Sequence, residues 1–294
     1  MKDNVLMQIA NALSANVQKL PDPGLLEGKM GVAVFLYHYA RYSGRTAYNQ
    51  LAGNLLDEIL ESMSDSEISF STGLSGIGWG MKHLLDEHFC EAEDDMLEEI
   101  DNSMIHYITN HTDEDMLDGC LYLAVCRPES LDDALTPVIA RQVTWFLSAG
   151  SHPLGVLNKL LVFAIRLPQL RLHPWFDKLP EAAIDAIDTP LYRRSDMMIC
   201  RDLLETSDFS RENSIWNILH DRCTAMPITD DFQTDCLETV WQNLVFLGGK
   251  RKRECDIEWI SKTVTDKLKD LSIQDMCFSA GLPAMGMDLL TVNG

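Results

Sequence analysis

The sequence predicts an all-α protein whose helical hairpins close into a ring, an α/α toroid of about six to seven hairpins. One observation is a glycine-rich turn leading into an apolar helix. It occurs at residues 70–80 (FSTGLSGIGWG), returns at 278–288 (FSAGLPAMGMD), and has a looser relative at 27–33 (EGKMGVA). The other observation is that segments apolar nearly all round alternate with amphipathic ones. Repeated helical pairs, each covering its neighbour's apolar side, produce both patterns.

The amphipathic segments are expected to be outer helices that face water on one side. The first is marked by Val5, Ile9, Leu13 and Val17 at spacings of four. Three more are predicted at 48–63, 91–107 and 130–147, each with apolar residues on one side and polar residues on the other.

The segments that are apolar nearly all round are expected to be inner helices, packed on every side. They lie at 31–40, 76–85, 117–126, 153–165 and 281–290. With weaker runs near Met197 and Val240, seven inner segments follow each other at intervals of about 33 to 46 residues, the length of one helical pair with its turns.

An open array of such pairs needs polar capping repeats at its ends. Here the best-matched motifs lie in the second and the last units, so a closed ring is the favoured arrangement. Residues 1–294 are therefore expected to form a single domain, with a central cavity lined by the glycine-rich turns.

The charge balance restricts the possible partners. The chain has 45 acidic and 24 basic side chains, giving a formal net charge of -21. Such a surface repels nucleic acids and anionic membranes, and a neutral or cationic partner fits better. The basic stretch 250–253 (KRKR) is interpreted as a solvated loop, with docking of an acidic leader peptide or partner protein as the alternative.

The sequence also predicts a cytoplasmic location without membrane insertion. No stretch is long enough to span a bilayer, and the first residues lack the unbroken apolar run of a signal peptide. The eight cysteines form no CxxC pair, and most lie inside helical patterns beside apolar residues, as reduced buried thiols do.

Residues 24–37 (GLLEGKMGVAVFLY) and 73–78 (GLSGIG) resemble the lanthionine synthetase C-like (LanC-like) family. The resemblance implies an α/α toroid whose turns hold a zinc ion at one mouth. In active members this zinc activates a peptide cysteine thiol for addition to a dehydrated serine or threonine, which forms a thioether ring. The partners implied are a peptide substrate or a partner modification enzyme.

The zinc ligands of that family are a cysteine from one inner turn and a Cys-His pair directly before the glycine of the next. No Cys-His dipeptide occurs in this chain. The two positions before Gly73 are Ser71 and Thr72, and those before Gly281 are Ser279 and Ala280, none of which offers a thiolate or imidazole. The resemblance therefore carries the fold and the cavity here, and no zinc cofactor is expected.

The glycine-rich turns supply the predicted binding residues at the cavity mouth, which are Ser71, Thr72, Gly73, Ser75, Ser279 and Gly281. Gly28, Gly73 and Gly281 precede their helices, so a positive φ or a tight turn is expected of them. The hydroxyls of Ser71, Thr72 and Ser279 occupy positions typical of helix N-caps, which is the structural alternative to ligand binding. Gly76 and Gly80 are expected to allow the close approach of another helix.

Two weaker sites remain possible. His220 and Cys223 would project on one helix face as two metal ligands, and the third ligand would come from Cys200, Cys236 or Cys277. His152, on an inner turn, is the best single acid or base candidate. Trp79, His38 and His83 fall on inner helices, where core packing and cavity lining explain them about equally.

Three functions fit these patterns. The first is a binding protein that holds a peptide or a partner enzyme at the glycine turns. The second is a working thioether-forming cyclase with an unconventional set of zinc ligands. The third is a carbohydrate-active toroid with paired acids, against which stands the clustering of acids on the outer helices.

Overall fold

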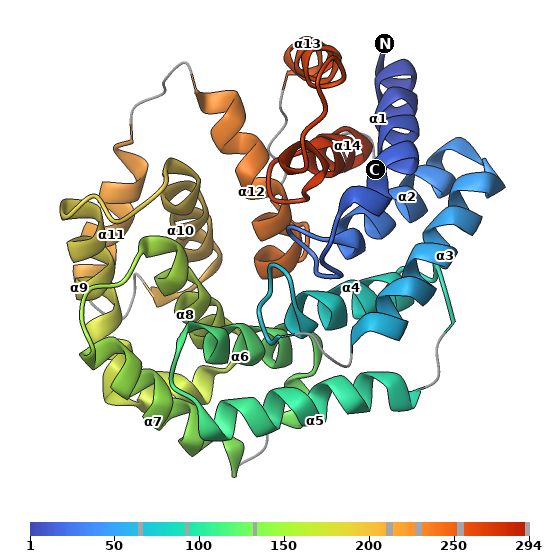
Figure 1. Ribbon diagram of the computed structural model, residues 1–294. Coiled ribbons are helices and arrows are strands. Elements are labelled where there is room, and N and C mark those ends of the chain that lie inside the picture. The colour runs from blue at the N-terminus through green and yellow to red at the C-terminus, as the bar shows by residue number, and fades with distance from the viewer. Residues whose placement is uncertain are drawn as a thin grey trace. The chain divides into compact units, whose positions relative to one another are not determined.

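The computed structural model describes residues 1–63, 67–91, 94–131, 134–209, 214–226, 231–251 and 256–291. Within these ranges the chain forms fourteen α-helices, four short 3-10 helices and no β-strand (Figure 1). The odd-numbered helices are α1 (Lys2–Asn16), α3 (Thr46–Ser62), α5 (Asp94–Asn110), α7 (Leu135–Ser148), α9 (Pro174–Asp188), α11 (Ser214–Thr224) and α13 (Ile257–Lys267). The even-numbered helices are α2 (Lys29–Ser43), α4 (Leu74–Asp86), α6 (Glu114–Cys126), α8 (Leu154–Arg166), α10 (Arg194–Thr206), α12 (Phe232–Leu247) and α14 (Leu282–Thr291). The 3-10 helices are η1 (Val17–Lys19), η3 (Pro128–Ser130), η4 (Pro168–Leu172) and η6 (Gln274–Met276).

The predicted all-α fold with two alternating kinds of helix is confirmed. Every residue of helix α2 from 30 to 37 is buried, so all faces of this part of the helix are covered. By contrast α3 buries only Ala52, Leu55, Leu56 and Ile59, which lie on one face of a helix. All seven predicted inner segments fall on even-numbered helices, and the weak runs near Met197 and Val240 belong to α10 and α12.

The chain divides into two compact units, each made of separate stretches of sequence. The first contains residues 1–97, 230–244 and 252–294, and the second contains 98–229 and 245–251. The expectation of one domain over 1–294 stays a prediction.

In the first unit the two ends of the chain meet. Helix α2 packs against α14 on one side and against α4 on the other, and α1 packs against both α13 and α3. Helix α1 and helix α14 also lie side by side, as the blue and red ends of the chain show in Figure 1. The first helical pair (α1 and α2) therefore contacts the second pair (α3 and α4) and also the last pair (α13 and α14). An α/α toroid requires this contact between first and last hairpins.

The second unit repeats this arrangement with other helices. Helix α8 packs between α6 and α10, while α9 contacts α7 and α11. Rows of even-numbered helices and rows of odd-numbered helices therefore form in both units. No helix in the described part of the chain is long and apolar enough to cross a membrane.

Candidate functional site: the glycine turns of the first unit

Three glycine-rich turns of the first unit lie in a row and are joined by backbone hydrogen bonds. The turns precede α2, α4 and α14, and we number them by their glycines as the Gly28, Gly73 and Gly281 turns. The Ser71 carbonyl accepts hydrogen bonds from the amides of Leu26 (3.0 Å) and Glu27 (3.2 Å). The Leu26 carbonyl in turn accepts from the amides of Phe278 (2.7 Å) and Ser279 (3.2 Å).

The contact between the Gly281 and Gly28 turns, which joins the two ends of the chain, therefore has the same form as the contact between the Gly28 and Gly73 turns. When the turns are aligned on their glycines, Leu26, Ser71 and Ser279 occupy the same position, two residues before the glycine. In both junctions a single carbonyl at this position accepts two amides from the neighbouring turn. A junction between the last and first repeats that matches an internal junction is what closure of a repeat array produces.

Glycine is required before these helices because other backbone atoms of the turn lie too close to leave room for a side chain. A left-handed conformation is not the reason. Of the two expected alternatives, the tight turn is confirmed and the positive φ is wrong: φ is -130° at Gly28 and -118° at Gly73, both extended, and Gly281 also lies outside the left-handed region. A Cβ on Gly73 would come within 2.0 Å of the Glu67 carbonyl oxygen. The turn folds back on itself so tightly that no side chain fits.

The same close approach occurs in all three turns, always with the residue six positions earlier. A Cβ on Gly28 would lie 2.6 Å from the Asp22 carbonyl oxygen, and one on Gly281 would lie 2.5 Å from that of Asp275. The residues at this position, Asp22, Glu67 and Asp275, are all acidic. These acids were not predicted as part of the site, although each lies six residues before its glycine in the sequence.

Gly31 and Gly76, three residues inside their helices, let the neighbouring turn come close. A Cβ on Gly76 would lie 2.2 Å from the Phe70 carbonyl oxygen and 2.8 Å from the Cβ of Leu25 in the Gly28 turn. A Cβ on Gly31 would lie 2.5 Å from the Cβ of Phe278 in the Gly281 turn. Gly80 lies against the Met30 side chain of α2, so Gly76 and Gly80 have the packing role expected of them.

The predicted N-caps are wrong. The residue that caps α4 is Gly73 itself, and no side chain caps this helix. Instead the Thr72 hydroxyl donates a hydrogen bond to the Glu67 carboxylate, and the Ser69 hydroxyl accepts from the Ser71 amide at 3.0 Å. Helix α14 begins at Leu282, which places Ser279 two residues too early to be its cap. The hydroxyls of Ser71 and Ser279 are thus not committed to helix capping.

Exposure separates the predicted mouth residues into two groups. Ser71, Thr72 and Ser279 are half-buried, so their side chains reach the surface of the turns. Gly73, Gly281 and Ser75 are buried, and Ser75 is 0% exposed. Ser75 therefore belongs to the packed start of α4 and does not line the surface of the mouth.

The exposed rim of these turns is acidic. Glu27 and Glu67 are exposed, and Asp22 and Asp275 are half-buried. Asp275 is held by Lys267 and by the amide and hydroxyl of Ser272. We call the part-exposed residues Glu27, Glu67, Ser71, Thr72 and Ser279 the glycine-turn mouth.

The donor groups at the glycine-turn mouth do not fit a zinc ion. The Gly281 turn contains one thiol, that of Cys277, which is 5% exposed and donates a hydrogen bond to the Ile273 carbonyl at 3.4 Å. Burial, together with the negative charges of Glu27, Asp275 and Asp22, raises the pKa of this thiol to about 11. Zinc binds thiolate, and this environment favours the thiol. No group of three metal-binding side chains occurs among the described residues.

The structure brings Cys223 next to Cys200, and His220 forms no group of three metal-binding side chains with them. Both thiols are fully buried, and a hydrogen bond between them, together with burial, raises the pKa of Cys200. The His220 ring lies instead by Glu205, with Nε2 3.8 Å from the carboxylate. Of the three other cysteines considered, Cys236 and Cys277 belong to the first unit.

His152 is tied to the preceding outer helix. Its Nε2 lies 2.9 Å from the Phe146 carbonyl oxygen, and its ring stacks on that of Phe146 at 4.1 Å. This anchoring fixes the turn before α8. A role of His152 in acid–base chemistry stays a prediction.

A half-buried histidine pair joins the inner helices α2 and α4 at the ends opposite their glycine turns. The Nε2 atoms of His38 and His83 are 2.9 Å apart, and Trp79 stacks on His83 at 4.9 Å. Burial, the nearby His83 and the Arg41 charge lower the pKa of His38 to about 3. Burial also lowers the pKa of His83, against the opposing charges of Glu87 and Asp86. Trp79 is 4% exposed, which assigns it to the core.

Some carboxylates lie on the inner helices, in addition to the acids that the sequence clusters on the outer ones. The inner helices α6 and α10 carry the buried Asp118 and Asp202. Asp118 pairs with Lys159 of α8 at 2.6 Å, and Asp202 pairs with Arg201 at 3.2 Å.

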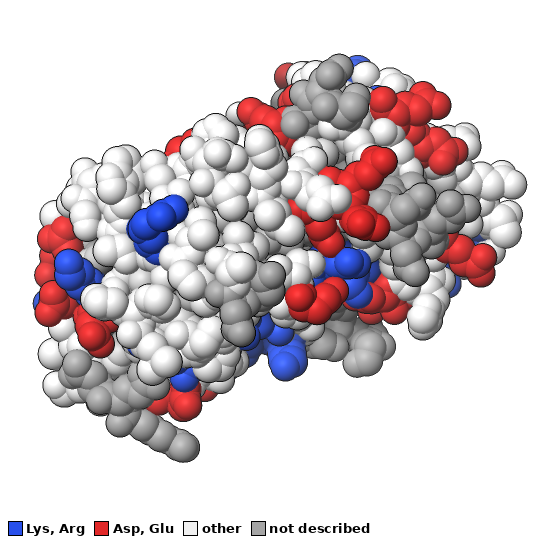
Figure 2. Space-filling model, turned by 90° about the horizontal axis from the view of Figure 1, so that it is seen from below, with Lys and Arg blue, Asp and Glu red and all other residues white. Residues whose placement is uncertain are grey.

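The basic stretch lies only partly in the described residues. Lys250 and Arg251 are described, and Arg251 pairs with Glu205 at 2.5 Å, whereas Lys252 and Arg253 lie outside the described residues. The negative charge of the chain is unevenly spread. Figure 2 shows one face of the molecule, where acidic side chains lie among broad areas without charged groups.

These features define a class of protein: an all-α repeat protein in which alternating helices are joined through glycine-rich turns. Residues 3–133, which contain the first two of these turns, match the family model described as lanthionine synthetase C-like protein. Over these residues the chain is similar to the LanC-like family. No curated protein and no solved structure matches the chain.

Proposed function

We propose that this LanC-like protein binds a peptide, or a peptide-modifying partner enzyme, at the glycine-turn mouth and does so without a zinc ion. The observation that carries the proposal is the row of three turns. Backbone hydrogen bonds hold the turns in register. Hydroxyls stand where the family's Cys-His pair would sit, and carboxylates lie at the rim. The family match supports a peptide as the kind of partner.

The charge of the mouth supports a neutral or cationic peptide. Glu27 and Glu67 are exposed at its rim, and the whole chain carries a net charge of -21. A basic peptide would be attracted before contact, and salt would weaken its binding. The hydroxyls of Ser71 and Ser279 are free of helix capping and would bind its backbone.

A peptide-binding measurement tests this proposal. We expect a labelled peptide of about 20 residues with lysines, serines and one cysteine to bind, and the same peptide with glutamates in place of the lysines to bind at least about threefold more weakly. The double change Glu27→Gln with Glu67→Gln should weaken binding of the basic peptide by a similar factor. The matched control is Glu61→Gln with Glu99→Gln, which removes two exposed carboxylates from α3 and α5 and should leave binding unchanged.

Equal binding by both double variants would contradict the proposed location. Measurement of the metal content of the purified protein tests whether binding occurs without zinc. One tightly held zinc per chain that is lost on changing His220 or Cys223 would contradict binding without a metal, and would favour the cyclase with unconventional ligands.

A further inference from the structure

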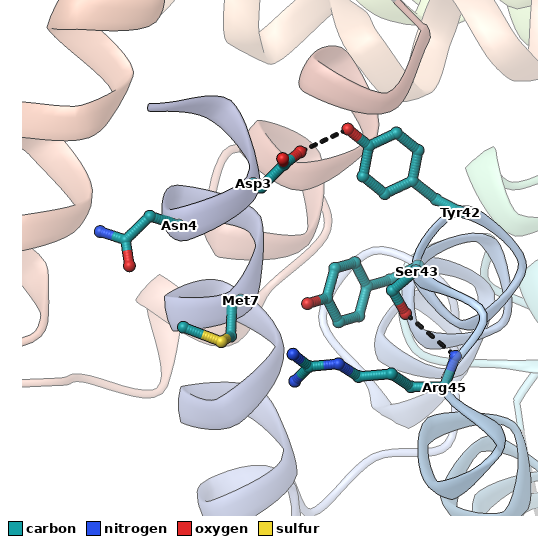
Figure 3. Close-up of a pocket in the computed structure, with 7 residues that line it drawn as sticks. Asp3, Asn4, Met7, Tyr42, Ser43 and Arg45 are labelled. Atoms are coloured by element: carbon teal, nitrogen blue, oxygen red, sulfur yellow. Dashed lines mark hydrogen bonds between the residues drawn. The ribbon is translucent and has the colours of Figure 1, made fainter.

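A pocket outside the glycine-turn mouth lies at the opposite end of α2. A pocket of about 660 Å³ opens between the start of α1 and the turn from α2 to α3. Figure 3 shows the residues that line it, which are Asp3, Asn4, Met7, Tyr39, Tyr42, Ser43 and Arg45. All of them belong to the first unit. Its volume is in the range of pockets that hold small molecules.

The turn that carries Arg45 has a fixed backbone. Gly44 ends α2 in the left-handed conformation at φ 68°, and its amide donates to the Ala40 carbonyl. The Arg45 amide lies 3.4 Å from the Ser43 hydroxyl, and Arg45 is the first residue before α3. In Figure 3 the Arg45 side chain extends from this turn toward Met7 on α1.

The guanidinium of Arg45 has no ion pair and no hydrogen bond among the described residues. The chain carries 45 acidic side chains, and none of those described pairs with this cation. Asp3, the acid of this pocket, is engaged elsewhere: it accepts a hydrogen bond from the Tyr42 hydroxyl at 2.6 Å. Five N–H donors in a planar fork are thus available to a ligand.

Tyr39 supplies a second free donor beside Arg45. Its side chain is 3% exposed, yet its hydroxyl makes no hydrogen bond in the described part of the chain. Arg45 is close enough for its charge to act on the Tyr39 hydroxyl. The ring cannot turn away, because it packs against Tyr48 at 4.9 Å and Phe35 at 6.0 Å. A hydroxyl without a protein partner at the wall of a pocket is available to form a hydrogen bond with a ligand.

We propose that this pocket binds a small monocarboxylate that carries an apolar or aromatic group. The carboxylate accepts from the Arg45 guanidinium and from the Tyr39 hydroxyl, which together match its two oxygens. Met7 and the tyrosine rings receive the apolar group. The Asp3 carboxylate at the same pocket repels a second negative charge, so a dianion such as phosphate binds worse than a monoanion.

N-acetyl-phenylalanine is a direct probe, and N-acetyl-phenylalaninamide is its neutral counterpart. We expect the acid to perturb the amide NMR signals of Met7 and Arg45 with a dissociation constant of about 1 mM or tighter, and the neutral amide to bind at least about tenfold more weakly. A short peptide with a free or an amidated C-terminus distinguishes a peptide end from a free small acid as the source of the carboxylate.

Two variants and a control locate the binding. Arg45→Gln should weaken binding of the acid by about tenfold or more, and Tyr39→Phe by several-fold while the ring keeps its packing. Arg141→Gln removes an exposed arginine from α7 and should change nothing. Equal binding of acid and amide, or no effect of Arg45→Gln, would overturn the proposal. Absence of binding by the acid at about 10 mM would overturn it as well.

Discussion

At the scale of single residues, the glycines carry most of the turn geometry. Each of Gly28, Gly73 and Gly281 lies against a carbonyl oxygen six residues earlier, and Gly31 and Gly76 lie against the neighbouring turn. Their importance could be predicted from the recurrence of the motif. The reason could not, because a close approach between two backbone segments depends on their positions in space, while the sequence shows only that no side chain is present.

Gly76→Ala is predicted to destabilise the protein by about 2 to 3 kcal/mol, because its Cβ would meet backbone atoms that cannot move aside. Gly53→Ala on α3 is the matched control, since the nearest atom to its Cβ would be the Tyr37 hydroxyl at 3.6 Å. There the higher helix propensity of alanine should stabilise by about 0.5 to 1 kcal/mol. Urea unfolding of both variants measures the difference, and equal effects would contradict this account.

The histidine pair predicts a pH dependence of stability. The folded pKa of His38 is lowered to about 3, while the unfolded value is the usual 6.5, so protons bind the unfolded chain preferentially. The stabilising contribution is present above pH 6.5 and is lost as the pH falls toward 3. Between pH 7.5 and 5.0 the wild type should lose about 2 kcal/mol more stability than His38→Gln.

Urea unfolding at the two pH values gives this comparison, with His106→Gln on the exposed side of α5 as the control. The same pH slope in wild type and His38→Gln would show that the half-buried histidine pair does not titrate as described. His106→Gln should keep the wild-type slope.

At the scale of elements, the helices themselves could be predicted well. The inner segments were recognised because a helix packed on all sides has no polar face, and even the weak runs near Met197 and Val240 fall on helices α10 and α12. The caps were predicted wrongly because Ser71 and Thr72 lie close to the start of α4 in sequence but belong to a turn that ends at Gly73. Propensity locates a helix start only to within a few residues.

The side-chain contacts between helices could not be predicted from the sequence. Asp118 on α6 and Lys159 on α8 form a buried ion pair 41 positions apart, and Cys200 on α10 meets Cys223 on α11. Burial disfavours the charged form of Lys159, but the charges of Asp118 and Glu114 outweigh burial and raise its pKa. Such contacts depend on which helices are neighbours, which periodicity does not reveal.

Lys159→Met is predicted to destabilise the protein by about 3 to 5 kcal/mol, because it leaves the Asp118 carboxylate buried without its cation. The double variant Asp118→Asn with Lys159→Met should recover most of this loss, since no buried charge remains. A double-mutant cycle by urea unfolding measures the coupling. Lys269→Met, which removes an exposed partner of Asp266, is the control and should have little effect. A double variant as unstable as Lys159→Met would contradict the role of this pair.

At the scale of the whole molecule, the account depends on the meeting of the two chain ends. The sequence supports closure through the motif at residues 278–288, which matches an internal repeat in place of a polar cap. The structure of the first unit adds the contact itself, through α14 against α2 and through the Leu26 carbonyl. The location of the candidate site at the glycine turns could be predicted from the sequence. Its acidic rim and the burial of Ser75 became visible only in the structure.

Native-state hydrogen exchange after Phe278→Ala tests the central claim most directly. Phe278 is 0% exposed, its amide bonds to Leu26, and its Cβ lies where Gly31 leaves room. Truncation of this ring should lower the opening free energies of α2 and α14 together, by about 3 to 5 kcal/mol. The control is Phe163→Ala on α8, a similarly buried phenylalanine of the second unit, which should lower the opening free energies of its own neighbours. A loss of protection confined to α14, with α2 unchanged, would contradict the meeting of the first and last repeats.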